Sequence, residues 1–238
     1  MNYAKNKKYF TSDGCTIFGA GVGTFFLSFF LLSFLSAMIG ENIGKPEIGA
    51  LLVFLSLIII APVVTFFIVK ALLAGRVTDE KYDAMIREHI QEMEQRALDK
   101  LGIDRDEVNE IDPIIIDGYN YDQCTLYKKG KDGVWRTNVY RVIYLFFSQN
   151  EVHSYTYEFS TTEDQKKDFT DVYFYQDIVS ASTESSTATF KNQKIQYESF
   201  KLTTSGGTSL NVSTRDSGHV QRSISAMRQL LRAKKVSQ

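Results

Sequence analysis

The chain has 238 residues, a formal charge of −1 and a hydrophobic content of 44 %. Because a nearly neutral chain lacks the basic excess of nucleic-acid-binding proteins, we expect no nucleic-acid partner. The two cysteines, Cys15 and Cys124, are too few and too far apart for a disulfide framework or a cysteine-rich metal site.

The first feature along the chain is a glycine-containing stretch, GAGVGT at 19–24. A phosphate-binding loop would need a preceding strand and a third glycine three residues after the second. Position 24 is Thr24, and the residues before the stretch are polar and basic. The pattern therefore favours close packing of membrane helices through Gly19 and Gly23, although glycine is also common in such helices without that role.

Two long runs without charged residues, Gly14 to Gly40 and Ile48 to Val69, occupy the first third of the chain. Since roughly 20 helical residues cross a membrane, we predict a two-helix transmembrane hairpin over 14–75, preceded by a tail at 1–13. A cleaved signal peptide is the alternative for the first run. Lysine and arginine flank both outer ends, which predicts a multi-pass cell-membrane protein with both termini in the cytoplasm.

The next segment, 76–110, is acidic and has a helical pattern. Thr78 is a candidate N-cap, acids occupy the following turn, and Gly102 ends the helix. Apolar side chains recur every three or four residues and form one stripe. The stripe is compatible with a partner-helix or self-association face, and equally with docking on the chain's own domain. It includes Tyr82, Met85, Ile86, His89 and Met93.

From Ile111 the apolar period changes to two, which is typical of strands. Seven segments are separated by turn residues, and an amphipathic helix is expected from about Ser217 to Lys234. The pattern predicts an α+β domain over 111–238, an antiparallel β-barrel or sandwich capped by the C-terminal helix. The segments are PIIID, DQCTLYK, VWRTNVYRVIYLFFS, EVHSYTYEFS, DVYFYQDIVSAST, IQYESFKLTT and TSLNVST.

Two stretches and the last helix of this region are similar to parts of a known family. The stretches are LYKKGKDGVWRTNVYRVIYLFFSQNEVHSY at 126–155 and YFYQDIVSAST at 173–183, and the helix contains SGHVQRSISAMRQLLRAKK. They resemble a pleckstrin-homology-like (PH-like) domain, in particular the bacterial kind attached to membrane spans, and the related GRAM domains. The resemblance implies a PH-like barrel that serves in scaffolding, lipid contact or protein contact, without catalysis.

No residue pattern points to a catalytic or metal site. The histidines His89, His153 and His219 fall in three different expected elements, without a second ligand at metal spacing. No nucleophile elbow, phosphate loop or zinc motif occurs. We therefore expect no enzyme activity, no cofactor and no metal.

Basic side chains gather in two places. Lys128, Lys129 and Lys131 lie in one hairpin turn, and Arg136 follows closely. Near an anionic leaflet each basic residue contributes about 1 kcal/mol, so these four are candidate lipid ligands, with an ordinary solvated surface as the alternative. The same two interpretations apply to the C-terminal segment from Arg215, where six basic residues against Asp216 give a net charge of +5.

Together these features predict a membrane-anchored cytoplasmic module that recruits or organises a protein partner, as a scaffold or as a subunit of a larger membrane complex. Membrane lipids and a second copy of the chain are further expected partners. The alternative function is a channel, pore or transporter accessory subunit that oligomerises through its hairpin.

Overall fold

The computed structural model describes residues 1–11, 14–42, 61–73, 77–190, 193–214 and 217–236, together with the positions 47, 49, 51 and 59. The chain divides into two compact units. One is Thr11–Val77, and the other combines Met1–Phe10 with Thr78–Gln238. The predicted N-terminal tail and acidic linker therefore belong largely to the same unit as the β domain.

The unit Thr11–Val77 contains helix α2, Gly14–Asn42, and helix α4, Ala61–Leu73, which pack against each other. Gly21 is the glycine that approaches α4, because a Cβ added there would lie 3.5 Å from Cγ2 of Val69. A Cβ at Gly19 or Gly23 would meet no described atom within 4 Å. The structure thus places the two predicted packing glycines away from the described part of the helix contact.

No helix in the described part of the chain is both long enough and apolar enough to cross a membrane. This finding contradicts the predicted transmembrane hairpin over 14–75 and the multi-pass location with cytoplasmic termini that rested on it. The part of the predicted second span that the structure describes as a helix is α4, whose 13 residues rise about 20 Å, against a hydrocarbon core of roughly 30 Å. Most of the predicted second span before Ala61 lies outside the described residues.

The helices of the other unit follow from local sequence signals. Helix α1 covers Tyr3–Thr11, and the predicted acidic helix is present as α5, Asp79–Gln91, and α6, Met93–Leu101. The Thr78 hydroxyl accepts a hydrogen bond from the backbone N–H of Lys81 at 3.3 Å, which confirms the predicted N-cap. Gly102 ends α6 in a left-handed conformation with φ of 67°.

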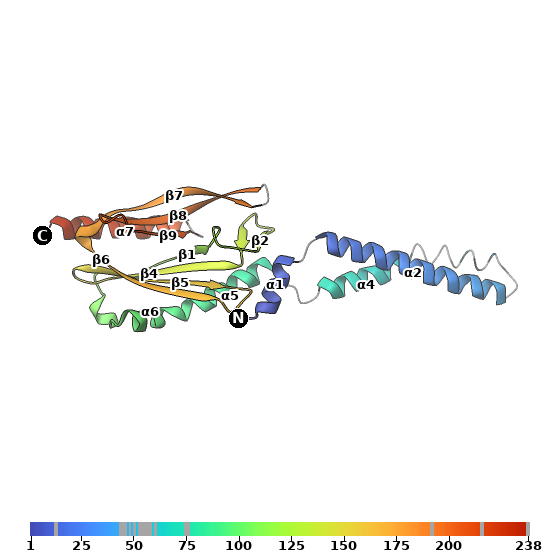
Figure 1. The fold of residues 1–238 in the computed structure, drawn as a ribbon. Coiled ribbons are helices and arrows are strands. Elements are labelled where there is room, and N and C mark those ends of the chain that lie inside the picture. The colour runs from blue at the N-terminus through green and yellow to red at the C-terminus, as the bar shows by residue number, and fades with distance from the viewer. Residues whose placement is uncertain are drawn as a thin grey trace. The chain divides into compact units, whose positions relative to one another are not determined.

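The strands form three antiparallel sheets (Figure 1), with orders β1-β4-β5-β6, β2-β3 and β7-β8-β9. Two 3-10 turns, η2 at Arg105–Glu107 and η3 at Tyr175–Asp177, and the final helix α7, Ser217–Val236, complete the unit. The strands are β1 Ile114–Tyr119, β2 Tyr127–Lys129, β3 Trp135–Thr137, β4 Val139–Phe147, β5 Glu151–Ser160, β6 Lys166–Phe174, β7 Ile178–Phe190, β8 Gln193–Thr204 and β9 Ser209–Ser213.

The predicted barrel does not close. The described residues contain helices and antiparallel sheets, but β6 and β7 each end a sheet and pair on one side only. The turn η3 separates these two strands, so the predicted single strand DVYFYQDIVSAST is divided between two sheets. The closed PH-like barrel expected from the sequence is therefore contradicted.

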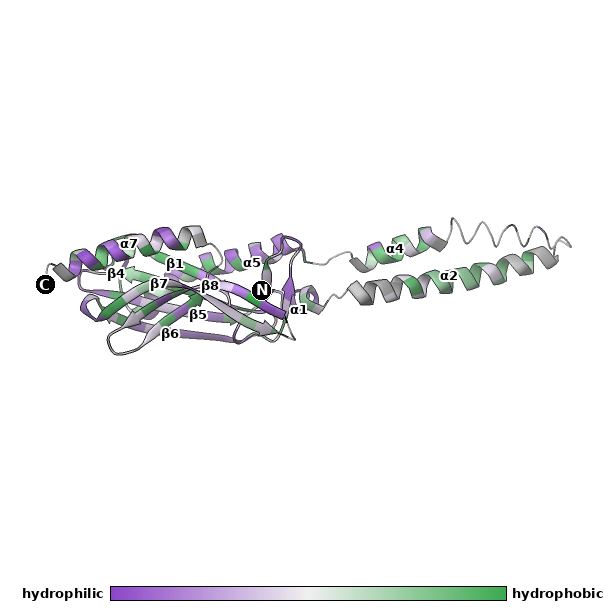
Figure 2. Ribbon diagram, turned by 90° about the horizontal axis from the view of Figure 1, so that it is seen from above, coloured by the Kyte–Doolittle hydropathy of each residue, from purple (hydrophilic) through white to green (hydrophobic). Residues whose placement is uncertain are grey.

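Strands β4 and β5 are covered on both faces, which explains why β4 is a nearly continuous apolar run and why every residue of β5 after Glu151 is buried. One face of β4, with Ile143 and Leu145, packs against Phe200 of β8 and Met227 of α7 in the main core. Helix α7 mixes hydrophobic and hydrophilic residues along its length (Figure 2) and contributes its buried apolar side chains to that core. The other face is aromatic and lies under α5 and α6, where the Tyr144 hydroxyl donates to the carbonyl of Ile90 at 2.6 Å.

A glycine permits the two larger sheets to meet where β1 passes β9. A Cβ added at Gly118 would lie 2.6 Å from the carbonyl carbon of Ser213 and would collide with its carbonyl oxygen. The Ser213 hydroxyl also donates to the carbonyl of Tyr119, so the two strands are bonded at this point. Only glycine leaves room for this approach.

We expect Gly118→Ala to reduce the free energy of unfolding by about 1–3 kcal/mol, because overpacked backbone must shift. Trp135, the single tryptophan, lies in the same unit and reports unfolding in denaturant by fluorescence. Gly206→Ala is the matched control, because a Cβ there would approach no described atom closer than 4.0 Å. Equal stability of both variants would contradict the proposed reason for the glycine.

Candidate functional site

Arg136 on β3 is the most deeply buried charged side chain among those with a described ion pair, with 2 % of it exposed. Its Nε and Nη2 donate to the two carboxylate oxygens of Asp83 on α5, both at 2.9 Å. Nη1 and Nη2 also donate to Asp132 in the β2–β3 turn, at 2.9 and 2.6 Å. The hydrogen bond to Arg136 holds the pKa of the Asp132 carboxyl well below its usual value.

A row of tyrosine rings continues from this ion pair to helix α1. Tyr82 stacks on Tyr9 with ring centroids 4.5 Å apart, and lies parallel to Tyr119 at 6.4 Å. The Tyr119 hydroxyl donates to Asp83 at 2.6 Å, and burial raises the pKa of this phenol. The Tyr9 hydroxyl donates to Asp79 at 2.7 Å. The network therefore joins α1, α5, β1 and the β2–β3 hairpin.

The predicted lipid-binding residues divide into two groups. Arg136 is enclosed by the carboxylates, and Lys128 donates to the carbonyl of Tyr9 at 3.2 Å with its ammonium 4.0 Å from the centre of the Tyr9 ring. Lys129 and Lys131 have exposed side chains on the hairpin. Contact with an anionic lipid stays a prediction, and the exposed pair is the part of the cluster accessible to one.

The predicted partner-helix stripe lies against the aromatic face of the four-stranded sheet. Tyr82 and Ile86 are fully buried, and the Tyr82 hydroxyl donates to the carbonyl of Thr137 at 2.9 Å. The His89 ring meets Phe159 edge to face at 4.8 Å, and burial lowers the pKa of its imidazole. Met85 and Met93 are half-buried beside them. Of the two interpretations left open by the sequence, the described contacts fit docking on the chain's own domain.

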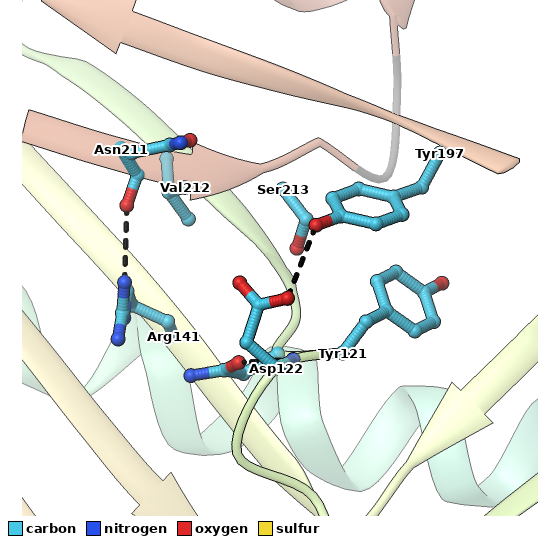
Figure 3. A pocket seen from close by; sticks show the side chains of 8 residues that line it. Tyr121, Asp122, Arg141, Tyr197, Asn211, Val212 and Ser213 are labelled. Atoms are coloured by element: carbon cyan, nitrogen blue, oxygen red, sulfur yellow. Dashed lines mark hydrogen bonds between the residues drawn. The ribbon is translucent and has the colours of Figure 1, made fainter. Parts of the chain in front are cut away.

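A small polar cavity of about 70 Å³ lies where β1, β4, β8 and β9 converge (Figure 3). Arg141 on β4 donates through Nε and Nη2 to Oε2 of Glu158, at 2.9 and 2.6 Å, and through Nη1 to the carbonyl of Asn211 at 3.1 Å. Across the cavity the Tyr197 hydroxyl reaches Asp122 at 3.4 Å. The cavity is lined by Asn120, Tyr121, Asp122, Arg141, Tyr197, Asn211, Val212 and Ser213.

The dimensions and bonding of this cavity indicate a structural junction. Ligand pockets usually enclose about 300–1,000 Å³, several times its volume. Two of its lining side chains, Arg141 and Asn120, already donate to the carboxylate of Glu158, with the Asn120 bond at 2.7 Å. Sequence reasoning missed this junction, although Arg141 is the single charged residue of the apolar strand β4 and signals a buried partner.

A larger groove of about 300 Å³ runs between the start of β7 and helix α7. Val179 is 63 % exposed beside it, at an irregularity in the β7–β8 pairing between Ile178 and Ser180. Arg228 donates through Nε to the carbonyl of Ala181 at 2.8 Å. The groove is lined by Ile178, Val179, Ser180, Ala181, Ser182, Arg228, Leu231 and Arg232, so its charged lining residues are both basic.

The described residues bear on two kinds of chemical site, a reactive thiol and a metal centre. Burial raises the pKa of the Cys124 thiol to about 11, so it is protonated at neutral pH and a poor nucleophile. Within the described ranges, no three His, Cys, Asp or Glu side chains converge in a way that could hold a metal ion.

Comparison of the chain with protein-family models, curated proteins and solved structures found no match. The resemblance to PH-like domains therefore stays a prediction made from the sequence.

We expect Arg136→Ala to lower the free energy of unfolding by about 3–5 kcal/mol, because Asp83 would be left buried without its counter-charge. Arg105→Ala is the matched control, since its pair with Glu94 has both side chains more than 40 % exposed and contributes at most about 1 kcal/mol. Denaturant unfolding followed by Trp135 fluorescence measures both. Similar losses in the two variants would show that the buried pair does not stabilise the fold.

Acid should weaken this cluster. Because the folded pKa of Asp132 is depressed, its contribution is complete above the unfolded value of about 4 and is lost as the pH falls toward the folded pKa. Asp132→Asn should therefore lose less stability than the wild type between about pH 5 and pH 2. Thermal unfolding across this range tests the slope, with Glu163→Gln in the exposed β5–β6 turn as the control. A slope unchanged by Asp132→Asn would contradict this linkage.

Proposed function

We propose that this chain is a binding module that holds an extended acidic segment of another protein in the groove between β7 and α7. The observation that carries the proposal is an open groove beside an edge strand, with two arginines and no carboxylate among its lining residues. Adding a strand to an exposed sheet edge is a common mode of peptide recognition, in which main-chain hydrogen bonds supply affinity.

The backbone of β7 is oriented for this role. The carbonyl of Ala181 points away from β8, since it accepts from Arg228 on α7. In an antiparallel strand the outward backbone groups recur at every second residue, so Thr183 and Ser185 present theirs on the same side. Arg228 occupies one position of this edge, and an incoming segment would exchange that bond for a main-chain bond.

Charge supplies the selectivity. Arg228 and Arg232 lie one turn apart on α7, and both are exposed. A guanidinium has five N–H donors arranged as a fork, which matches a carboxylate or phosphate in a bidentate geometry. Arg228 uses Nε on Ala181, and its two Nη groups are available for an acidic side chain of the segment. A basic segment would meet repulsion at the same place.

A role in protein contact agrees with what the PH-like resemblance implies, and anionic-lipid contact through Lys129 and Lys131 is a separate prediction. The alternative as a channel or transporter subunit depended on the transmembrane hairpin, so it has no basis in the described helices.

Selection of a random peptide display library on the full chain tests the proposal. We expect enrichment of extended, acidic, β-prone sequences, and at least about tenfold weaker binding to Arg232→Glu, a loss of about 1.4 kcal/mol. Arg222→Glu is the matched control, because Arg222 is on the same helix but outside the groove lining. The proposal fails if no acidic sequence is enriched, or if the two variants bind the selected peptides equally.

A further inference from the structure

Strand β6 leaves one edge of the four-stranded sheet without a neighbouring strand among the described residues. Seven of its nine residues are exposed, and Asp168 and Tyr173 are half-buried. Its pairing with β5 runs without a bulge from Lys166 to Phe174, and it contains no proline. Bulges and prolines are among the usual devices that prevent an edge strand from pairing with another chain.

The backbone direction of this edge follows from one hydrogen bond. The N–H of Ser160 donates to the carbonyl of Gln165 at 2.8 Å, so this opposed pair is a hydrogen-bonded one. Bonded and non-bonded pairs alternate along an antiparallel ladder, and the register with β5 is continuous. The even-numbered residues, from Lys166 through Thr170 to Phe174, therefore direct their N–H and C=O groups outward.

Apolar side chains accompany the open backbone. Phe169, Val172 and Phe174 are 53, 50 and 51 % exposed. Phe169 lies opposite Thr156 in the register, on the face that carries the core, whereas Val172 lies opposite His153 on the other face. A long exposed edge strand that carries large apolar residues on both faces is a template for association.

The charges of β6 are self-complementary. Lys166 and Lys167 balance Asp168 and Asp171, so the strand has no net charge. When a second β6 is placed antiparallel about Phe169, Lys167 of each copy lies opposite Asp171 of the other. Asp168 of one copy then lies opposite Thr170 of the other. Because the backbone groups of both residues point outward, the two strands can form main-chain hydrogen bonds there.

We propose that two copies of this chain associate through β6, in the antiparallel register centred on Phe169, and so join two four-stranded sheets into one of eight strands. The interface is isologous: the two Phe169 rings meet on the two-fold axis, with a Lys167–Asp171 pair on either side. Asp168 does not oppose this arrangement, because Arg96 and Lys100 of its own chain hold its carboxylate at 3.1 and 3.2 Å. This self-association is independent of the groove between β7 and α7.

Disulfide trapping tests the contact and its register. In the full chain with Cys15→Ser and Cys124→Ser, Phe169→Cys would place two cysteines at a non-bonded pair with Cα atoms about 4.5 Å apart, within disulfide range. Mild oxidation should convert most of the protein to a covalent dimer. Thr170→Cys is the register control, because Thr170 would face Asp168 and not itself. No dimer at position 169, or equal yields at both positions, would overturn the proposal.

A charge exchange separates loss of the contact from loss of the fold. Asp171→Lys and Lys167→Asp each replace two attractive pairs with two repulsive ones, so each should weaken the dimer about tenfold or more. The combined exchange restores both pairs and should return the dissociation constant to within about threefold of the wild type. Glu163→Lys, outside the strand, is the charge control. Failure of the combined exchange to recover dimerisation, in a chain whose Trp135 fluorescence is native, would refute this register.

Exposed apolar side chains on α2, such as Phe30 and Phe34, are a second possible site of association. A measurement of molecular mass alone would therefore not identify β6 as the contact. The dissociation constant is therefore measured from the concentration dependence of the disulfide yield at Phe169→Cys. If the chain forms larger species whose yield is unchanged by the charge exchange, the copies associate through another surface and the β6 proposal is wrong.

Discussion

The buried guanidinium of Arg136 is the constraint on which the larger unit depends. Its two carboxylate partners come from helix α5 and from the β2–β3 turn, segments 53 and 4 residues away along the chain. Leaving such a charge unpaired costs several kcal/mol, so the pair fixes where α5 lies on the sheet. The tyrosine stack then carries this position on to α1, which explains why Met1–Phe10 and Thr78–Gln238 form one compact unit.

Fixing α5 in this way determines which surfaces can bind a partner. The helices α5 and α6 cover the aromatic face of β4 and β5, while the second sheet and α7 cover the other. With both faces of β4 and β5 buried, the unpaired main-chain groups of this sheet lie at its edge strands. The small cavity at the sheet junction is lined by groups that already bond to other groups of the protein, so it offers little to a ligand.

Patterns that depend on neighbouring residues were predictable from the sequence, whereas those that depend on distant partners were not. The cap at Thr78, the stop at Gly102, the hairpin turn at SQNE and the start of α7 at Ser217 are local, and the structure has each of them. Arg136 resembles a surface cation in its basic hairpin, because nothing nearby in sequence reveals Asp83. The break at Asn138 was also missed, since its amide oxygen accepts from the N–H groups of Thr125 and Leu126 in a distant loop.

The edge strands β6 and β7 differ in a way that fits the different roles proposed for them. At β7, Arg228 bonds to one outward carbonyl and α7 stands beside the strand, so anything that binds there must contact basic side chains as well as backbone. Among the described residues, no side chain of a neighbouring helix is seen to bond to the outward backbone of β6. The charges of the two lysines and two aspartates of the strand sum to zero. A strand with opposite charges arranged about its centre pairs best with an inverted copy of itself, because a strand of one sign would leave half of these charges unmatched. The two proposals therefore rest on the charge pattern of each edge, and not on the presence of an edge alone.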